Sequence, residues 1–169
     1  MKLKTFLQGL DKVSDWSGRV CIWLIVPLTL LVVFEVISRR VFNLPHIWAT
    51  EVTDFIYGPH FMLVAAYTLL HQGHVSIEVI YELFSPKVKV VLDCFTYLIF
   101  FFPFCIIVLY QGVLFAHTSW SIGETSESAA LTIVPLVKTA IPVAFLLILI
   151  QGLANFIRRV NFLIKGKEI

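Results

Sequence analysis

The sequence has few charged residues and few cysteines for its length. Of its 169 residues, 14% are charged and 59% are hydrophobic, and the mean hydropathy is +0.89. A water-soluble domain of this size has too small an interior to hide so much apolar material. The net charge is only +2, and no basic cluster marks a folded soluble face, so nothing supports nucleic-acid binding. The composition predicts a membrane protein.

Motifs for catalysis and for metal or cofactor binding are also missing. The chain has no glycine-rich phosphate loop, zinc-ligand spacing or nucleophile elbow, so we expect no enzyme, no metal site and no cofactor. Cys21, Cys94 and Cys105 all lie in apolar stretches, and the last two are about 16 Å apart along one predicted helix, too far for a disulfide. The absence of Cys-x-x-Cys argues against a thiol oxidoreductase.

Four apolar stretches are long enough to cross a hydrocarbon core of about 30 Å. We place these spans at about 20–38, 50–70, 90–116 and 137–157. They predict an all-α membrane protein with four transmembrane helices that form a single membrane domain over residues 1–169.

Two further helical features are predicted outside these spans. Apolar residues recur at helical spacing from Leu3 to Trp16, which predicts an amphipathic helix over 3–17 that lies at the membrane interface. Ser85 and Pro86 are typical of an N-cap and a first helical turn, so the third helix is expected to start there.

The distribution of Lys and Arg predicts the orientation, because short cytoplasmic segments retain these residues. Ten of the 13 basic residues lie in the N-terminal segment, the 71–89 loop and the C-terminal tail, whereas Arg39, Arg40 and Lys138 lie on the other side. We therefore expect both termini and the 71–89 loop to be cytoplasmic. The loops 39–49 and 117–136 are then periplasmic.

Acidic residues inside the predicted spans need an explanation, because each costs about 2.5–3.5 kcal/mol at mid-bilayer. Glu35 and Glu51 lie close to the periplasmic edge, where Arg39 and Arg40 are available as partners. Asp54 is deeper, so it either pairs across the bundle or faces another protein.

Two functional alternatives stay open. Glu51, Asp54 and His60 fall on adjoining faces of one predicted helix and could form the proton or cation site of an independent small carrier. The third and fourth spans offer few polar groups for such a pathway. The other alternative is a haem- or quinone-linked membrane subunit, but no two histidines share a mid-span depth. The candidate ligands would be His46, His60, His71, His74 and His117.

Motifs along most of the chain resemble those of a known family. They are Arg39-Arg40-Val41-Phe42-Asn43, then Trp48 and Glu51, Ala65-Ala66-Tyr67, Gly73-His74-Val75-Ser76-Ile77-Glu78, Ser119-Trp120-Ser121-Ile122-Gly123-Glu124 and Lys138. In this order and spacing they resemble the small membrane subunit of a tripartite ATP-independent periplasmic (TRAP) transporter, the DctQ family, from about Val33 to Arg159. Two positions depart from the family pattern: Arg40 replaces the usual aromatic residue, and Val64 stands where glycine is frequent. The later motifs resemble a branch that is often labelled as mannitol or chloroaromatic transport.

The resemblance implies a multi-pass subunit of the bacterial inner membrane. Its partners would be a large membrane subunit of the DctM family, a periplasmic substrate-binding protein of the DctP family and the lipid bilayer. The large subunit would move an organic anion, usually a carboxylate, together with sodium, so the sodium site would belong to that subunit. The small subunit would brace the large one.

Several residues are candidates for subunit contacts. We expect a structural cluster near the periplasmic edge that consists of Arg39, Arg40, Trp48, Glu51 and Asp54. His74 and Glu78 are expected to order the cytoplasmic loop or to contact the large subunit. Further interface candidates are Trp120 and Lys138. The candidates for contact with the binding protein are Glu124 and Glu127.

Overall fold

The structure, a computed structural model, describes residues 2–71, 73, 84–128 and 131–165. The described residues are helical along most of their length and contain no β-strand, which confirms the prediction of an all-α protein. The elements in chain order are α1 (Lys2–Ile22), α2 (Ile25–Val41), α3 (Ile47–Leu70), α5 (Pro86–Thr96), the π-helix η1 (Tyr97–Phe101), α6 (Phe102–Ile122) and α7 (Val134–Lys165). As expected, Ser85 is the N-cap residue that precedes α5.

Three helical stretches are long and apolar enough to cross a membrane. They cover Lys4–Val41, Lys87–Ile122 and Val134–Ile164. The helix α3 has 24 residues but is not among them, and it carries Asp54 and His60 within its length. A membrane protein is therefore supported, whereas the fourth span stays a prediction.

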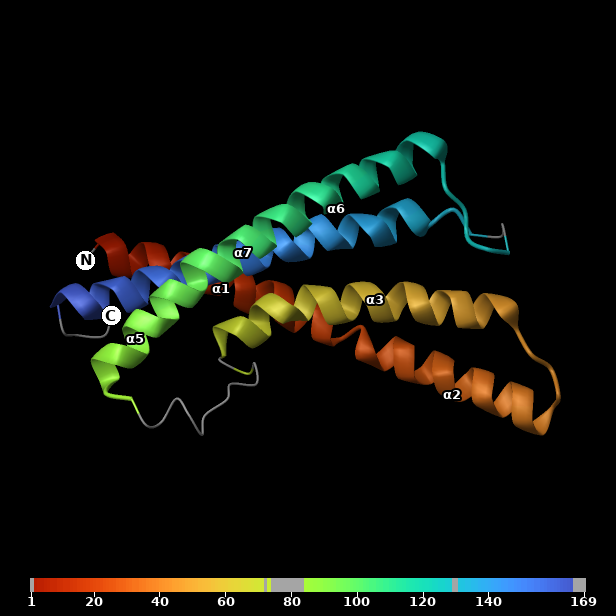
Figure 1. The fold of residues 1–169 in the computed structure, drawn as a ribbon. Coiled ribbons are helices and arrows are strands. Elements are labelled where there is room, and N and C mark those ends of the chain that lie inside the picture. The colour runs from red at the N-terminus through yellow and green to blue at the C-terminus, as the bar shows by residue number, and fades with distance from the viewer. Residues whose placement is uncertain (1, 72, 74–83, 129–130, 166–169) are drawn as a thin grey trace.

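The helices form two antiparallel hairpins (Figure 1). One hairpin consists of α2 and α3, and the other consists of the α5–η1–α6 helix and α7. The turn between α2 and α3 and the loop between α6 and α7 lie at one end of the molecule, while both chain termini lie at the other end. Which end faces the cytoplasm stays a prediction from the basic residues.

The N-terminal helix packs within the bundle. α1 contacts both α3 and α7, and its residues Leu7, Ser14 and Gly18 are buried. A Cβ atom added to Gly18 would overlap the Cβ and ring atoms of Tyr67 on α3. The stretch 3–17, which the sequence assigns to an interfacial helix, is thus part of a helix that continues to Ile22.

A break separates α1 from α2 at Trp23 and Leu24. Pro27 has no N–H to donate to the carbonyl of Trp23, four residues earlier. The chain tightens here to bonds three residues apart, from Leu24 N to Cys21 O at 3.1 Å and from Val26 N to Trp23 O at 3.2 Å. α2 consequently begins after a short irregular segment (Figure 1).

A second irregularity, η1, precedes Pro103. The N–H of Phe102 bonds to the carbonyl of Tyr97, five residues earlier, and such π-type bulges commonly accompany a proline kink. The bulge sets Phe101 against Gly152 on α7, where an added Cβ atom would overlap the ring. The irregular turn and the glycine together allow close contact between these two helices.

The core is built from small side chains. The buried apolar residues that the structure describes include six alanines on three helices, whereas many large apolar side chains on the same helices are exposed. Small residues let helix backbones approach closely, and large ones on the outside suit a lipid environment. The six alanines are Ala49, Ala66, Ala116, Ala140, Ala144 and Ala154.

Candidate functional site

Glu35 is the centre of the corner between α2 and α3. Its Oε1 accepts a hydrogen bond from Arg39 Nη2 at 2.9 Å, one helical turn away, and another from the backbone N–H of His46 at 3.3 Å. The Nδ1 atom of His46 lies 3.4 Å from the second carboxylate oxygen. The Glu35 side chain is only 11% exposed. The carboxylate therefore holds the start of α3 against α2.

The turn between these helices is bonded to Ser38. The backbone N–H groups of Phe42 and Leu44 both donate to the Ser38 carbonyl, and the Ser38 hydroxyl donates to the carbonyl of Leu44 at 2.8 Å. Asn43 has φ of 54°, a left-handed conformation that asparagine tolerates better than most residues. The corner is thus defined by backbone bonds as well as by Glu35.

Aromatic rings cover the corner. The ring of His46 lies 5.6 Å from that of Phe34 and 5.8 Å from that of Trp48, measured between centroids. Phe34 and Trp48 are themselves 6.2 Å apart. Trp48, a predicted member of the structural cluster, therefore joins α3 to α2 through tilted and edge-on ring contacts.

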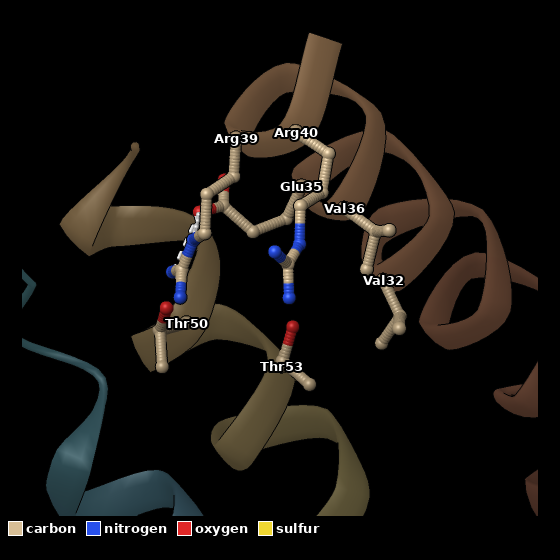
Figure 2. A pocket seen from close by; sticks show the side chains of 7 residues that line it. All are labelled: Val32, Glu35, Val36, Arg39, Arg40, Thr50 and Thr53. Atoms are coloured by element: carbon tan, nitrogen blue, oxygen red, sulfur yellow. Dashed lines mark hydrogen bonds and ion pairs between the residues drawn. The ribbon is translucent and has the colours of Figure 1, made fainter. Parts of the chain in front are cut away.

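Two arginines line a pocket of about 320 Å³ between α2 and α3. Figure 2 shows Arg39 and Arg40 reaching across from α2, Arg39 towards Thr50 and Arg40 towards Thr53. The remaining lining residues are Val32, Glu35 and Val36. Arg39 is bonded to Glu35, whereas Arg40 makes no hydrogen bond or ion pair with any residue that the structure describes.

Glu51 connects the two hairpins. Its two carboxylate oxygens accept hydrogen bonds from the backbone N–H and from the hydroxyl of Ser128, both at 2.8 Å. The Ser126 hydroxyl lies 3.3 Å from that of Ser128 and accepts from the N–H of Leu131. One side chain on α3 thereby fixes the loop between α6 and α7.

The predicted cluster is therefore distributed over three places. Arg39 and Arg40 line the pocket, Trp48 lies against His46, and Glu51 bonds to the opposite loop. Asp54 is exposed on α3. The residues share one end of the molecule but do not form one contiguous group.

A second ion pair fixes the end of α6. Lys138 Nζ donates to Glu124 Oε1 at 2.7 Å, and the Ser119 hydroxyl donates to Glu124 Oε2 at 2.6 Å. These bonds, that of Lys138 first, hold the pKa of the Glu124 carboxyl below its usual value. Trp120 Nε1 donates to the hydroxyl of Thr139 on α7 at 3.0 Å.

The remaining predicted contact residues divide into two groups. Glu127 is exposed and forms no ion pair with the described residues. Glu124, the other glutamate proposed to contact a binding protein, pairs with Lys138. His74 and Glu78 lie outside the described residues.

A polar network at the opposite end was missed by the sequence analysis. Asp11 on α1 pairs with Arg158 on α7, and it also accepts from Gln151 Nε2 at 3.2 Å. Asn155 accepts from Gln151 and Arg158 and reaches the carbonyl of Leu69 on α3 at 3.4 Å. The network joins three helices. Its signal in the sequence is the spacing of Gln151, Asn155 and Arg158, which places them on one helical face.

Three of the histidines, His46, His60 and His71, have individual structural partners. His60 Nδ1 lies 2.8 Å from the carbonyl of Cys21, at the end of α1, and His71 lies 3.6 Å from Asp15. Among the described residues, no group of three metal-ligating side chains occurs. Glu51 and His60, two members of the hypothetical cation site, turn to different partners.

Comparison with known protein families identifies the family of this chain. A family model described as "Tripartite ATP-independent periplasmic transporters, DctQ component" matches residues 28–162. A search of curated proteins found no match. The family match covers most of the chain but does not identify a branch, so the mannitol or chloroaromatic label stays a prediction.

Proposed function

We propose that this chain, which belongs to the DctQ family and is therefore the small membrane subunit of a TRAP transporter, acts as a fixed scaffold for the large transport subunit. Proteins of this family work with DctM and DctP partners in TRAP transporters, and they are transporter subunits, not enzymes. The proposed partners are accordingly a large DctM-family subunit and a periplasmic DctP-family binding protein, at the bacterial inner membrane. The proposed cargo is an organic anion, with carboxylates as the expected class. Sodium coupling is assigned to the large subunit.

The observation that carries the scaffold role is the use of polar side chains to tie helices together at both ends. Glu51 bonds to Ser128 across the two hairpins, and Asp11 bonds to Arg158 and Gln151 at the other end. A carrier that moves part of itself across the bilayer needs a second part that stays still. Internal ties of this kind suit the part that stays still.

An independent carrier is less well supported. His60, the polar residue nearest to the middle of α3, is engaged with the backbone carbonyl of Cys21. Carriers bring polar groups of several helices to one place near the membrane midplane. Here the described polar networks lie apart from one another: Glu51 bonds to Ser128 near the start of α3, and the network of Asp11, Gln151 and Asn155 reaches Leu69 near the end of α3.

The first test is purification of the tagged chain from its native membrane in mild detergent, followed by mass spectrometry. Stoichiometric recovery of one large many-helix protein is the expected result. Recovery of the chain alone, stable and monodisperse, would count against the scaffold role. Flux measurements in proteoliposomes would then test the carrier alternative, and a visible absorption spectrum would test the haem alternative.

Glu51→Ala tests whether the tie between the hairpins shapes the surface that the large subunit recognises. The variant should lower recovery of the complex because the 123–133 loop loses both bonds to α3. Glu127→Ala is a matched control, since Glu127 is an exposed glutamate of the same loop. Equal recovery of the large subunit with both variants would contradict the proposal.

We also propose that Glu127 contacts basic groups of the binding protein. Glu127→Lys should weaken docking of the binding protein to the membrane complex because an exposed charge is reversed. Reversal at Glu124 is less informative alone, since it also breaks the pair with Lys138. Unchanged docking after reversal at both sites would remove this contact.

A further inference from the structure

The pocket between α2 and α3 contains a positive charge that no residue in the described part of the chain neutralises. Arg39 and Arg40 contribute two positive charges to its lining and Glu35 one negative charge. Oε1 of Glu35 accepts hydrogen bonds from Arg39 and from the N–H of His46, and Oε2 lies 3.4 Å from His46 Nδ1. Arg40 is left with its guanidinium directed into the pocket (Figure 2) and without a partner among the described residues.

The position of both arginines in the last turn of α2 explains only part of this arrangement. A cation at a helix C-terminus interacts favourably with the helix dipole, and Arg39 and Arg40 both lie there. The dipole does not require the two side chains to reach across to α3, where they lie over Thr50 and Thr53. A second guanidinium aimed into a pocket is suited to an anion with several oxygen atoms, because its planar fork of N–H groups matches phosphate or carboxylate.

The other side of the pocket is apolar. Val32 and Val36 line it, and these two valines are 41% and 54% exposed on α2, which continues as an apolar helix surface. In a chain that belongs in a membrane, this surface faces hydrocarbon. The pocket therefore combines an anion site with a wall that can receive an alkyl chain, at the charged end of an apolar helix.

We propose that this pocket binds a phospholipid, with the headgroup phosphate at Arg40 and Arg39 and an acyl chain along Val32 and Val36. Its volume of about 320 Å³ is at the lower end of the range of roughly 300–1,000 Å³ for ligand pockets, so it takes the phosphate region and not the whole lipid. Basic pockets between membrane helices bind headgroups in this manner. The lipid would neutralise Arg40 and fill the corner between the two helices.

The test is lipid binding to the full-length detergent-purified protein, followed by native mass spectrometry. Three probes separate the possible ligands: phosphatidylglycerol, a diacylglycerol with the same acyl chains and no phosphate, and glycerol 3-phosphate without acyl chains. Phosphatidylglycerol should bind in preference to the other two. Arg40→Gln should lower its affinity about fivefold, the order expected for one basic residue near a membrane surface, and Arg40→Lys should lower it less.

Arg19→Gln is the matched control. Arg19 is an exposed arginine on α1 whose pair with Asp15 lies away from the pocket lining, so its loss should leave lipid binding unchanged. Because Arg40 has no bond to break among the described residues, Arg40→Gln should unfold at the same temperature as the wild type. A photoactivatable phosphatidylglycerol should label peptides of α2 or of the start of α3 and lose this labelling in Arg40→Gln.

Three outcomes would overturn the proposal. Equal binding of phosphatidylglycerol and diacylglycerol would show that the phosphate is not recognised. Displacement of the lipid by equimolar glycerol 3-phosphate would assign the site to a free anion. Equal effects of Arg40→Gln and Arg19→Gln on lipid binding would show that the net charge of the protein, and not the pocket, determines the affinity. Since these measurements use the chain alone, they are independent of whether a large subunit copurifies.

Discussion

Replacement of Gly18 by alanine should destabilise the protein, although alanine is the better helix former. Gly18 lies in α1 at its contact with α3, and an added Cβ atom would overlap the Cβ and ring of Tyr67. The Cβ of Tyr67 is attached to the backbone of α3, so it cannot move without a shift of that helix. Gly9 lies in the same helix and has nothing within 4 Å of the position that a Cβ would occupy.

The difference in the free energy of unfolding between Gly18→Ala and Gly9→Ala measures the cost of overpacking at Gly18. Each change from glycine to alanine in a helix gains about 0.5–1 kcal/mol from backbone entropy and propensity. Overpacking costs roughly 1–3 kcal/mol, and only Gly18→Ala suffers it. We therefore expect Gly9→Ala to be more stable than the wild type and Gly18→Ala to be less stable than Gly9→Ala by roughly 1–3 kcal/mol.

Thermal unfolding in detergent, followed by tryptophan fluorescence, measures this difference. With about 2–4 °C per kcal/mol for a chain of this size, the two variants should unfold several degrees apart. Gly18→Leu should be less stable again, because the larger side chain requires a larger separation of α1 from α3. If Gly18→Ala unfolds at the same temperature as Gly9→Ala, α1 and α3 do not approach each other as closely at Gly18 as described.

Two further predictions concern the ion pairs at the two ends. Asp11→Asn should destabilise the fold by about 1–2 kcal/mol because it leaves Arg158 without its charged partner. Asp15→Asn, which affects the exposed Arg19 and the half-exposed His71, should change stability by less than about 0.5 kcal/mol, and similar losses in thermal unfolding would contradict this distinction. Lys138 and Ser119 hold the pKa of the Glu124 carboxyl below its usual value. The stabilisation from this contact is therefore fully present above the usual carboxyl pKa and is lost as the pH falls through the lowered pKa. Protection of the 123–128 amides from hydrogen exchange, expressed relative to the intrinsic rate at each pH, should therefore fall at acid pH in the wild type, and Glu124→Gln, in which this protection is low at all pH values, should lack the transition.

Local features of the fold could be predicted from the sequence because they depend on neighbours along the chain. Ser85 and Pro86 start a helix whatever the helix packs against. The pair between Glu35 and Arg39 follows from their separation of four residues on one helix. Apolar composition likewise predicts a membrane protein without knowledge of helix contacts.

Contacts between helices could not be predicted in the same way. Glu51 was matched with the arginines nearest to it in sequence, yet its partner Ser128 is 77 residues away. The partner depends on how α3 is rotated against the other hairpin, which hydropathy does not specify. Asp11 was assigned to the polar face of an interfacial helix for the same reason, because an amphipathic pattern does not tell whether the polar face meets water or a neighbouring polar helix face.

The pairing of Asp11 with Arg158 has a consequence for biogenesis. These residues are 147 positions apart, so at about 5–20 residues per second the ribosome needs roughly 7–30 s between them. Throughout that interval α1 has been synthesised but its polar contacts on α7 do not yet exist. Nascent chains that stop before α7 would therefore carry Asp11 without Arg158 and Gln151, the partners that it has in the complete chain.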